Sequence, residues 1–387
     1  MKKFWVVHNI PSPYRLHIFN ALWKECQKRD LDFHVHFMSD MSHGYEERPL
    51  SWRNPKMEFP YTYWRDYGRG QRHVNPGLLW HLRKNKPDYL LSGSPFDTLT
   101  GMFAGRMTNG VACTWVEGNT RNPGKIGGII GLIKRFALSG YRYVAVPGVQ
   151  GERYIALHQA LTRWKMPKCI LLPNLVNEAL FDVSRLRAMR MQDVGPAFEM
   201  RERFGCKKEE RLCIVPSRLD PVKGVLEFLS CVTPEMLRGW RVVIAGNGPL
   251  YDDAQRIIRD KGIADRVVIN GFVKYEDMPA LYAASDLLLL PSLRDQNPLA
   301  IVEGLHAGLT IAESDQAGNV EEAVTEGKNG WVLPVKDKDA FVGKLRTIFD
   351  TPIEHLSEMG RCSQEENAKY WNSRDAIRAF IDALIDG

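Results

Sequence analysis

Asp295 and Glu303 are two acids eight positions apart within residues 291–308, a stretch whose residue types could bind a substrate. The apolar run before it, residues 287–290, is typical of a buried parallel strand. Polar residues then turn the chain into a predicted helix that carries Glu303. The two acids could hold hydroxyl groups of a sugar or a ribose. The alternative interpretation is an ordinary strand–helix unit with solvated acids.

The start of that helix is a predicted anion site. Asn297 is predicted as the N-cap and Pro298 as the first helical residue. Because Pro298 has no N–H, the first backbone amides that the helix leaves free are those of Leu299 and Ala300. Free amides at the positive end of a helix dipole attract phosphate. Together with the two acids, this helix start predicts a nucleotide-sugar pocket.

Two cations, Arg218 and Lys223, stand five positions apart in another predicted strand-to-helix loop. The charge on a departing diphosphate must be stabilised as it develops, which Arg does through two parallel hydrogen bonds and Lys as a point charge. Gly246 opens a further loop of this kind, Gly246-Asn247-Gly248-Pro249. Either cation alone is more often a solvated surface residue, so the prediction depends on the loops as a set.

The elements that must position these loops alternate between strands and helices, first over residues 1–176 and again over residues 211–360. Such alternation is typical of parallel, doubly wound sheets. Residues 177–210 are predicted as an interdomain connection, and residues 361–387 as a C-terminal helix that crosses back to the first domain. The prediction is an α/β chain with two Rossmann-like domains facing across a cleft, lined by the carboxyl ends of the strands.

The composition, with 44% hydrophobic and 25% charged residues, is that of a globular protein. Residues 1–190 hold 28 Lys and Arg against 14 Asp and Glu, which predicts an anionic partner such as a membrane surface. The apolar segment 126–138 could lie on that surface, although such a helix more often packs on a sheet. Seven scattered cysteines predict reduced thiols in the cytoplasm. No apolar run reaches about 18 residues, so no transmembrane helix is predicted.

In their order, these motifs resemble those of the retaining GT-B glycosyltransferases of family 4, the glycosyl transferases group 1. A Pro-Tyr-Arg sequence ending at Arg15 is similar to a variant seen in surface-polysaccharide members. Any one motif is weak evidence, whereas the ordered set is specific. The segments that carry the resemblance are Leu172-Pro173-Asn174, Ser217-Arg218-Leu219 with Lys223-Gly224, Ala245-Gly246-Asn247-Gly248-Pro249, Asp295 through Glu303, and Gly318-Asn319-Val320-Glu321.

The resemblance implies roles for individual residues. Arg218 and Lys223 would contact the diphosphate and stabilise the leaving nucleotide. Glu303 would accept hydrogen bonds from the ribose, and Asp295, in place of the usual Glu, would hold hydroxyls of the donor sugar. The other implied donor contacts are the backbone near Val273 and Lys274 for the base, the amides of Leu299 and Ala300 for phosphate, and the loop residues Asn297 and Gly246.

Two departures from the family concern the first domain. The glycine-rich donor loop after the first strand is absent, and Arg15 would instead reach a phosphate or the acceptor. Glu117 stands where many members carry a His near the reacting sugar carbon. A carboxylate there would orient the acceptor hydroxyl or stabilise positive charge on the sugar. The alternative is a plain loop acid.

The resemblance implies transfer of a sugar from a nucleotide-diphosphate sugar to a hydroxyl, with retention at the anomeric carbon and without a metal or other cofactor. The pair Asp337 and Asp339 follows the last predicted strand, where Asp339 is predicted as a helix N-cap and not as a metal ligand. The predicted acceptor is a glycan or lipid-linked glycan of cell-surface polysaccharide synthesis. The enzyme would work in the cytoplasm, docked at the inner face of the plasma membrane.

Three other classes of protein could share some of these features. A dinucleotide oxidoreductase would need Gly-x-Gly-x-x-Gly directly after the first strand, whereas Gly246 and Gly248 come late and without a third Gly. A nucleic-acid binder would account for the basic first half, but no recognised module is present and the second half is acidic. A non-catalytic GT-B protein, which binds a nucleotide sugar or a partner without turnover, stays open because Asp295 replaces Glu.

Overall fold

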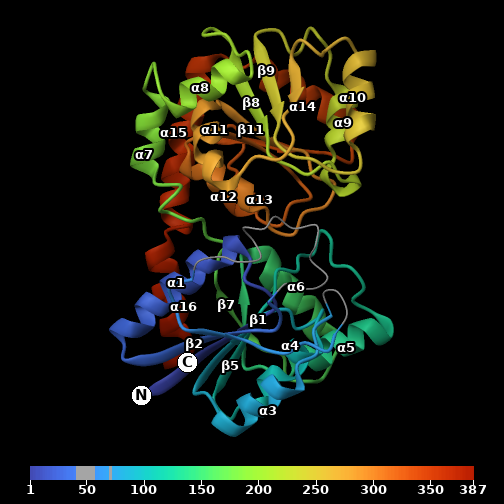
Figure 1. Ribbon diagram of the computed structural model, residues 1–387. Coiled ribbons are helices and arrows are strands. Elements are labelled where there is room, and N and C mark those ends of the chain that lie inside the picture. The colour runs from blue at the N-terminus through green and yellow to red at the C-terminus, as the bar shows by residue number, and fades with distance from the viewer. Residues whose placement is uncertain (41–56, 69–71) are drawn as a thin grey trace. The chain divides into compact units, whose positions relative to one another are not determined.

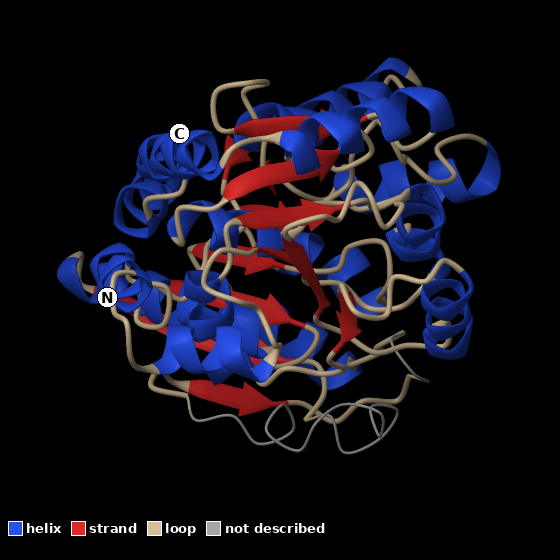
Figure 2. Ribbon diagram, turned by 90° about the horizontal axis from the view of Figure 1, so that it is seen from above, coloured by secondary structure: helices blue, strands red, loops and turns tan. Residues whose placement is uncertain are grey.

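The computed structural model describes residues 1–40, 57–68 and 72–387, which divide into two compact units (Figure 1). One unit consists of Met1–Asn177 with Asn372–Gly387, and the other of Glu178–Trp371. Each unit contains one sheet, and helices lie outside the strands (Figure 2).

The sheet of the first unit is parallel throughout, in the order β3-β2-β1-β4-β5-β6-β7. Its β4 and β6 are buried at every position, as expected for strands that are covered on both faces. The strands are β1 (Lys2–His8), β2 (Leu31–Phe37), β3 (Tyr61–Tyr63), β4 (Tyr89–Ser92), β5 (Val111–Trp115), β6 (Tyr143–Val146) and β7 (Lys168–Leu171). The helices are α1 (Pro13–Lys28), α3 (Pro76–Asn85), α4 (Leu99–Ala104), α5 (Gly128–Leu138), α6 (Val149–Ala160) and α16 (Ser373–Asp386), with a 3₁₀ turn at Gly105–Met107.

The sheet of the second unit is also parallel, in the order β10-β9-β8-β11-β12-β13. The strands are β8 (Arg211–Val215), β9 (Trp240–Ile244), β10 (Val267–Ile269), β11 (Leu287–Leu290), β12 (Thr310–Ser314) and β13 (Gly330–Leu333). The helices are α7 (Val183–Arg190), α8 (Pro196–Arg203), α9 (Val225–Cys231), α10 (Tyr251–Asp260), α11 (Met278–Ala284), α12 (Leu299–His306), α13 (Val320–Ala323), α14 (Lys338–Asp350) and α15 (Ile353–Tyr370), with 3₁₀ turns at Pro221–Lys223 and Tyr275–Asp277.

Aromatic residues fix the core of the second unit. Trp240 is fully buried and meets Phe349 of α14 edge to face, with 5.3 Å between the ring centroids. Its indole Nε1–H donates a hydrogen bond of 2.8 Å to the carbonyl oxygen of Phe349, so the buried donor is satisfied. These contacts hold α14 against β9.

Both sheets have a point where the strand order reverses, between β1 and β4 in the first and between β8 and β11 in the second. In doubly wound sheets, ligands bind beyond the carboxyl ends of the strands at this switch point. The predicted pair of Rossmann-like sheets is confirmed. The loops that follow β8 and β11 carry Arg218, Lys223 and Asp295 among the predicted donor-binding residues.

The stretch predicted as a connection, residues 177–210, contains two helices that pack on α11 of the second unit, α7 and α8. Of the eight residues of α7 only Leu186 is buried, so the sequence lacks the apolar period that would have indicated this helix. Arginines of α7 and α8 hold both helices to the sheet through polar contacts described below.

The predicted C-terminal helix over residues 361–387 is two helices. The first, α15, packs on α12 and β12 of the second unit, whereas α16 packs on α1, β5 and β7 of the first. The chain breaks at Asn372, whose side chain caps α16 by accepting a 3.0 Å hydrogen bond from the Asp375 N–H. The predicted return of a C-terminal helix to the first unit is confirmed for α16.

The N-cap of α14 is Asp337, and the prediction of Asp339 was wrong. The Asp337 carboxylate accepts a 3.1 Å hydrogen bond from the Ala340 N–H, and Asp339 lies in the first turn. The positive end of the helix dipole attracts an acid at either position, so charge alone could not show which of the two is the N-cap.

Candidate functional site

The loops that follow β8 and β11 lie in contact at the switch point of the second sheet. Gly224 has a positive φ of 66°, and a Cβ there would lie 2.0 Å from the carbonyl oxygen of Pro291. Only glycine tolerates both conditions. The Arg294 N–H donates a hydrogen bond of 3.1 Å to the Val222 carbonyl oxygen. The backbone therefore brings the predicted cation loop and the predicted acid loop together.

Lys223 and Asp295 form the central contact between these loops. The Lys223 Nζ lies 2.6 Å from the Asp295 Oδ2, and the Ser292 hydroxyl donates to the same oxygen at 3.3 Å. Both side chains of the ion pair are largely shielded from solvent, with 26% and 12% exposed. Shielding strengthens such a pair relative to one on the open surface. One predicted phosphate contact and the predicted sugar contact are thus neighbours.

Arg218 differs from Lys223 in its exposure. Its side chain is exposed and pairs with Asp220 of the same loop. The predicted glycine loop runs against this loop, because a Cβ on Gly246 would lie 1.9 Å from the Ser217 carbonyl oxygen. The Leu219 N–H also donates to the Asn247 carbonyl oxygen at 3.1 Å. Because the two backbones approach this closely, only glycine, which has no side chain, fits at position 246.

The prediction of Asn297 as the N-cap of α12 was wrong. The N-cap is Pro298, which has an extended backbone with φ −68° and ψ 116°, and the helix begins at Leu299. The Pro298 carbonyl oxygen accepts a 3.3 Å hydrogen bond from the Asn319 side-chain amide. Leu299 and Ala300 are therefore the first two helical residues, whose N–H groups an α-helix leaves without an intrahelical partner.

Glu303 is buried inside α12, with 6% of its surface exposed. Burial raises the pKa of its carboxyl to about 7, and the Tyr282 hydroxyl, which donates a 2.8 Å hydrogen bond to Oε2, acts in the opposite direction. The carboxyl therefore changes charge near neutral pH. In its ionised form it is a strong hydrogen-bond acceptor for a hydroxyl group.

Tyr282 and Phe181 were not predicted as site residues. The Phe181 ring lies 5.7 Å from the Tyr282 ring and 5.9 Å from the Tyr275 ring, centroid to centroid. Tyr275 directly follows the predicted base-binding backbone, in which Val273 is half-buried and Lys274 exposed. An aromatic path thus connects that loop with Tyr282 and α12. The one signal in the sequence is a tyrosine within the otherwise apolar run 278–284.

The two predicted residues of the first unit form an ion pair in which Arg15 is buried and Glu117 is partly exposed. Arg15, in the first turn of α1, is only 7% exposed and pairs with Glu117, which follows β5. Arg15 Nη1 also donates a 2.9 Å hydrogen bond to the side-chain oxygen of Asn174, which follows β7. Loops at the carboxyl ends of three strands thus meet at this pair.

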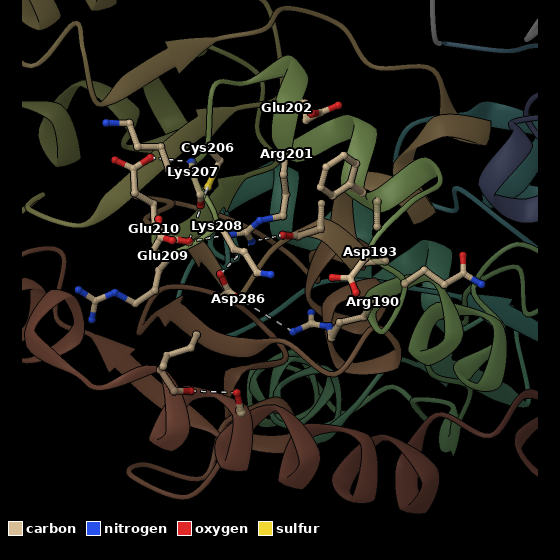
Figure 3. A pocket seen from close by; sticks show the side chains of 18 residues that line it. Arg190, Asp193, Arg201, Glu202, Cys206, Lys207, Lys208, Glu209, Glu210 and Asp286 are labelled. Carbon is tan, nitrogen blue, oxygen red and sulfur yellow. Dashed lines mark hydrogen bonds and ion pairs between the residues drawn. The ribbon is translucent and has the colours of Figure 1, made fainter.

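A cavity of about 1040 Å³ lies in the second unit (Figure 3). Arg211 at the start of β8 and Asp286 just before β11 line it, so it lies near the amino ends of these strands, whereas the predicted donor loops follow their carboxyl ends. Five cations and five acids line it, so their formal charges cancel. These are Arg190, Arg201, Lys207, Lys208, Arg211, Asp193, Glu202, Glu209, Glu210 and Asp286.

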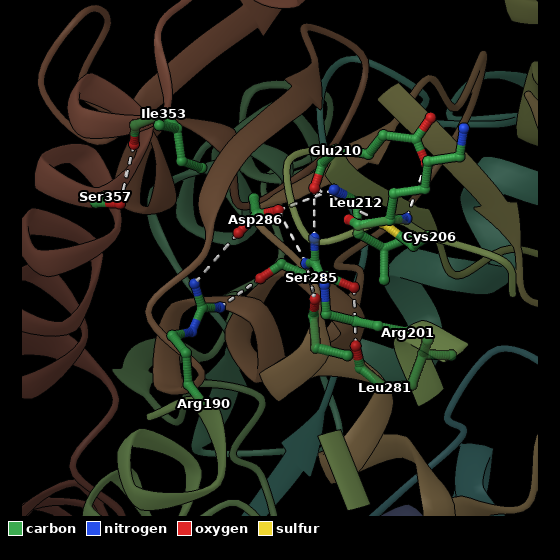
Figure 4. Close-up of polar contacts among 12 residues, drawn as sticks. Arg190, Arg201, Cys206, Glu210, Leu212, Leu281, Ser285, Asp286, Ile353 and Ser357 are labelled. Carbon is green, nitrogen blue, oxygen red and sulfur yellow. Dashed lines mark hydrogen bonds and ion pairs between the residues drawn. The ribbon is translucent and has the colours of Figure 1, made fainter. Parts of the chain in front are cut away.

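The polar contacts at this cavity are structural (Figure 4). Arg201 of α8 donates to the Ala284 carbonyl oxygen at 2.8 Å and lies 3.3 Å from the Asp286 carboxylate. The same carboxylate accepts a 2.8 Å hydrogen bond from the Leu212 N–H of β8, and Arg190 of α7 donates to the Ser285 carbonyl oxygen at 2.5 Å. We call Arg190, Arg201 and Asp286 the arginine clasp. It holds α7 and α8 to the sheet.

Among the described residues, no group of three or more His, Cys, Asp or Glu side chains could hold a metal ion. None of the helices in this part of the chain has the length and apolar character needed to span a bilayer.

Residues 197–366 match the family model of the glycosyl transferases group 1. This match agrees with the resemblance to the glycosyl transferases group 1 inferred from the motifs. Among curated proteins, the chain is 28% identical over 156 residues to an alpha-D-kanosaminyltransferase of Streptomyces kanamyceticus, covering 40% of each chain. It is 30% identical over 187 residues to a GDP-mannose-dependent alpha-(1-6)-phosphatidylinositol monomannoside mannosyltransferase of Mycolicibacterium smegmatis, covering 45% of this chain and 47% of the relative.

These alignments span about half or less of the length of the curated relatives. Among solved structures, Anabaena HepE in complex with UDP aligns over 100% of both chains, with a TM-score of 0.73 and 16% identity. WaaG, a glycosyltransferase involved in lipopolysaccharide biosynthesis, also aligns over 100% of both chains, with a TM-score of 0.68 and 15% identity. At these identities the likeness shows the fold, which is that of the GT-B glycosyltransferases.

Proposed function

We propose that this chain is a retaining glycosyltransferase that moves a sugar from a nucleotide-diphosphate sugar to a hydroxyl acceptor. The observation that carries the proposal is the contact of Lys223 with Asp295 at the switch point of the second sheet, beside the first free amides of α12. A cation, an acid and a helix start at one place suit a sugar diphosphate, whose phosphates are anionic and whose sugar carries hydroxyls.

In the proposed reaction, the acceptor oxygen bonds to the anomeric carbon as the bond from that carbon to the phosphate oxygen breaks. The proton of the acceptor hydroxyl passes to a phosphate oxygen of the leaving nucleotide, on the same face of the sugar. Lys223 and the exposed Arg218 stabilise the negative charge that develops on the diphosphate, and Glu303 accepts a hydrogen bond from the ribose. Asp295 holds the sugar hydroxyls, with no metal ion taking part.

The direct test is transfer measured by NMR with a panel of nucleotide sugars and hydroxyl acceptors, with and without a chelator. We expect a retained anomeric configuration and no effect of the chelator. Lys223→Ala should lower kcat by about 10²–10³-fold, the range for losing one donor that stabilises a developing oxyanion. Arg346→Ala, which removes an exposed cation of α14, should leave kcat unchanged. Unaltered turnover in Lys223→Ala would refute this diphosphate site, and donor binding without turnover would favour the non-catalytic alternative.

We further propose that the acceptor is a lipid-linked glycan of cell-surface polysaccharide synthesis and that the enzyme docks on the inner face of the plasma membrane. The support is one face of α5. Ile129 is 75% exposed, and Ile130, Leu132 and Ile133 are also exposed, while the opposite side of the helix packs on the first unit. Such large apolar side chains favour the interface of a bilayer, at about 1.5–3 kcal/mol for each one fully buried.

Basic residues border this apolar face. Lys125 is exposed just before α5, and Arg163, Trp164 and Lys165 are exposed in a loop beside it. The Trp164 ring lies 6.4 Å from the ring of Phe136 in α5, which places the loop next to the helix. An apolar face with cations at its border suits an anionic bilayer.

Flotation with anionic and neutral vesicles tests the membrane proposal. Wild type should float with anionic vesicles, and Ile129→Ser/Ile133→Ser should not. Met191→Ser, which removes a 78% exposed apolar side chain from the second unit, should float like wild type. A wild type that binds neither vesicle, or a double variant that floats normally, would refute the docking face without affecting the proposed reaction.

A further inference from the structure

We propose that Arg15 is a positioning residue, which holds the Glu117 carboxylate so that it can bind a hydroxyl group of the substrate. This inference rests on the proposed glycosyl transfer. It replaces the prediction that Arg15 itself contacts a phosphate or the acceptor. The geometry of the pair and the unequal exposure of its two members support this assignment.

Both terminal nitrogens of the Arg15 guanidinium already have partners within the first unit. Nη1 donates to Asn174 at 2.9 Å, Nη2 pairs with Glu117 Oε1, and the guanidinium carbon lies 4.1 Å from the centroid of the Trp115 ring. An arginine fork bound on both arms and stacked on an indole has a fixed orientation. With 7% of its surface exposed, Arg15 is not placed to meet a phosphate from solvent.

Glu117 has the complementary properties. Its side chain is 36% exposed, and within the described part of the chain Arg15 is the one partner recorded for it, through Oε1. The second carboxylate oxygen is therefore available to a ligand. The backbone beneath it is fixed as well, because a Cβ on Gly118 would lie 2.5 Å from the ring of Tyr154. An anchored carboxylate with one open oxygen accepts a hydrogen bond from a correctly placed hydroxyl without further reorganisation.

The charge of the pair identifies the kind of group that it binds. Arg15 and Glu117 cancel in formal charge, and the exposed member is the anion, so a phosphate gains nothing at this surface. A neutral hydroxyl donates well to a carboxylate. Asn174, from the Leu-Pro-Asn motif, then has a defined part, since its side-chain oxygen fixes the other arm of Arg15.

The test is a double-mutant cycle on transfer kinetics, with Arg15→Met, Glu117→Gln and the double variant. Each single change should lower kcat on the order of 100-fold, the cost of a reacting group misplaced by about 1 Å, with the donor KM unchanged. The double variant should lose no more than either single one, because the two residues act as one unit. Arg15→Lys should recover part of kcat. Arg29→Met, which breaks another arginine–acid pair of the first unit, should keep the wild-type kcat.

Two results would overturn the inference. One is a double variant in which the kcat losses of the single variants multiply, and the other is an Arg15→Met variant that raises the donor KM and keeps kcat. If Arg15→Met does not fold, Asn174→Leu provides the second measurement. It should lower kcat by less than Glu117→Gln does and add nothing to that variant. A wild type that transfers no sugar would refute the proposed function and this inference with it, whereas wild-type transfer with multiplying losses would refute the inference alone.

Discussion

Replacing Glu303 with Gln is expected to stabilise the folded protein at pH 8 while weakening nucleotide binding. Burial raises the pKa of the Glu303 carboxyl from its ordinary 4.5 to about 7 in the folded protein. This difference corresponds to about 3 kcal/mol of unfolding free energy that the ionised carboxyl costs the folded state. Gln keeps an oxygen that can accept from the Tyr282 hydroxyl but carries no charge to desolvate.

The sign of the pH dependence follows from proton binding. Below about pH 4.5 the carboxyl is protonated in the folded and the unfolded chain, so it contributes no difference. Between about 4.5 and 7 the folded state binds the proton more tightly, and stability falls as pH rises. Above about 7 the full cost is present. The gain from Glu303→Gln should therefore be absent near pH 4.5 and reach its upper limit above pH 7.

Thermal unfolding of wild type and variant between pH 5 and pH 8 measures this gain. At about 2–4 °C per kcal/mol for a unit of this size, the difference in Tm should grow to at most roughly 6–12 °C. Glu209→Gln, which removes an exposed acid of the same unit, is the control and should shift Tm equally at every pH. Tyr282→Phe removes the group that lowers the Glu303 pKa, so the loss of stability should continue to higher pH than in wild type.

Two results would refute this reasoning about Glu303. One is a Tm difference that does not change with pH, and the other is a Gln variant that is less stable than wild type at pH 8. Nucleotide binding, followed by calorimetry, should tighten as pH rises through about 7 in wild type, because a ribose hydroxyl donates best to the ionised carboxyl. That dependence should vanish in the variant.

Two further predictions concern backbone packing and the arginine clasp. Gly246→Ala should destabilise the second unit by about 1–3 kcal/mol and raise the donor KM, because its Cβ would lie 1.9 Å from the Ser217 carbonyl oxygen. The control is Gly343→Ala, whose Cβ meets open space on α14, and it should stabilise the unit by about 0.5–1 kcal/mol. Unfolding in denaturant measures both changes. Arg201→Ala should lower the unfolding free energy by about 1–3 kcal/mol with the donor KM unchanged, because it leaves buried hydrogen-bond acceptors without a donor. Arg203→Ala, which removes an exposed side chain of the same helix, should change the unfolding free energy by at most about 0.5 kcal/mol.

The sequence predicted the layers of the fold because its central strands are buried on both faces. Residues 287–290 are four leucines in a row, and this run identifies a parallel strand without reference to tertiary contacts. Residues 183–190 lack such a run, since α7 is held by polar contacts to carbonyl groups far along the chain. Long-range hydrogen bonds of this kind leave no period in the sequence.

The sequence singled out candidate site residues by their types, but it does not show which of them are in contact. Lys223 and Asp295 were singled out by their types, but their contact joins positions 72 apart. The sequence also does not show that Glu117 and Asn174 bind the guanidinium of Arg15, which was predicted to contact a phosphate or the acceptor. The N-cap of α12 was placed one residue early, since proline's fixed φ suits both the first helical position and the extended residue before it.

The route of the chain through its two units has a consequence for biosynthesis. The second unit is continuous, from Glu178 to Trp371, whereas the first is completed only by α16. The apolar side of α16, with Ile377, Phe380, Ile381 and Leu384, covers part of the first unit's core. During synthesis from the N-terminus, the ribosome therefore delivers the last piece of the first unit after all of the second. The part of the first unit that is made first must wait, with an uncovered apolar surface, until α16 emerges.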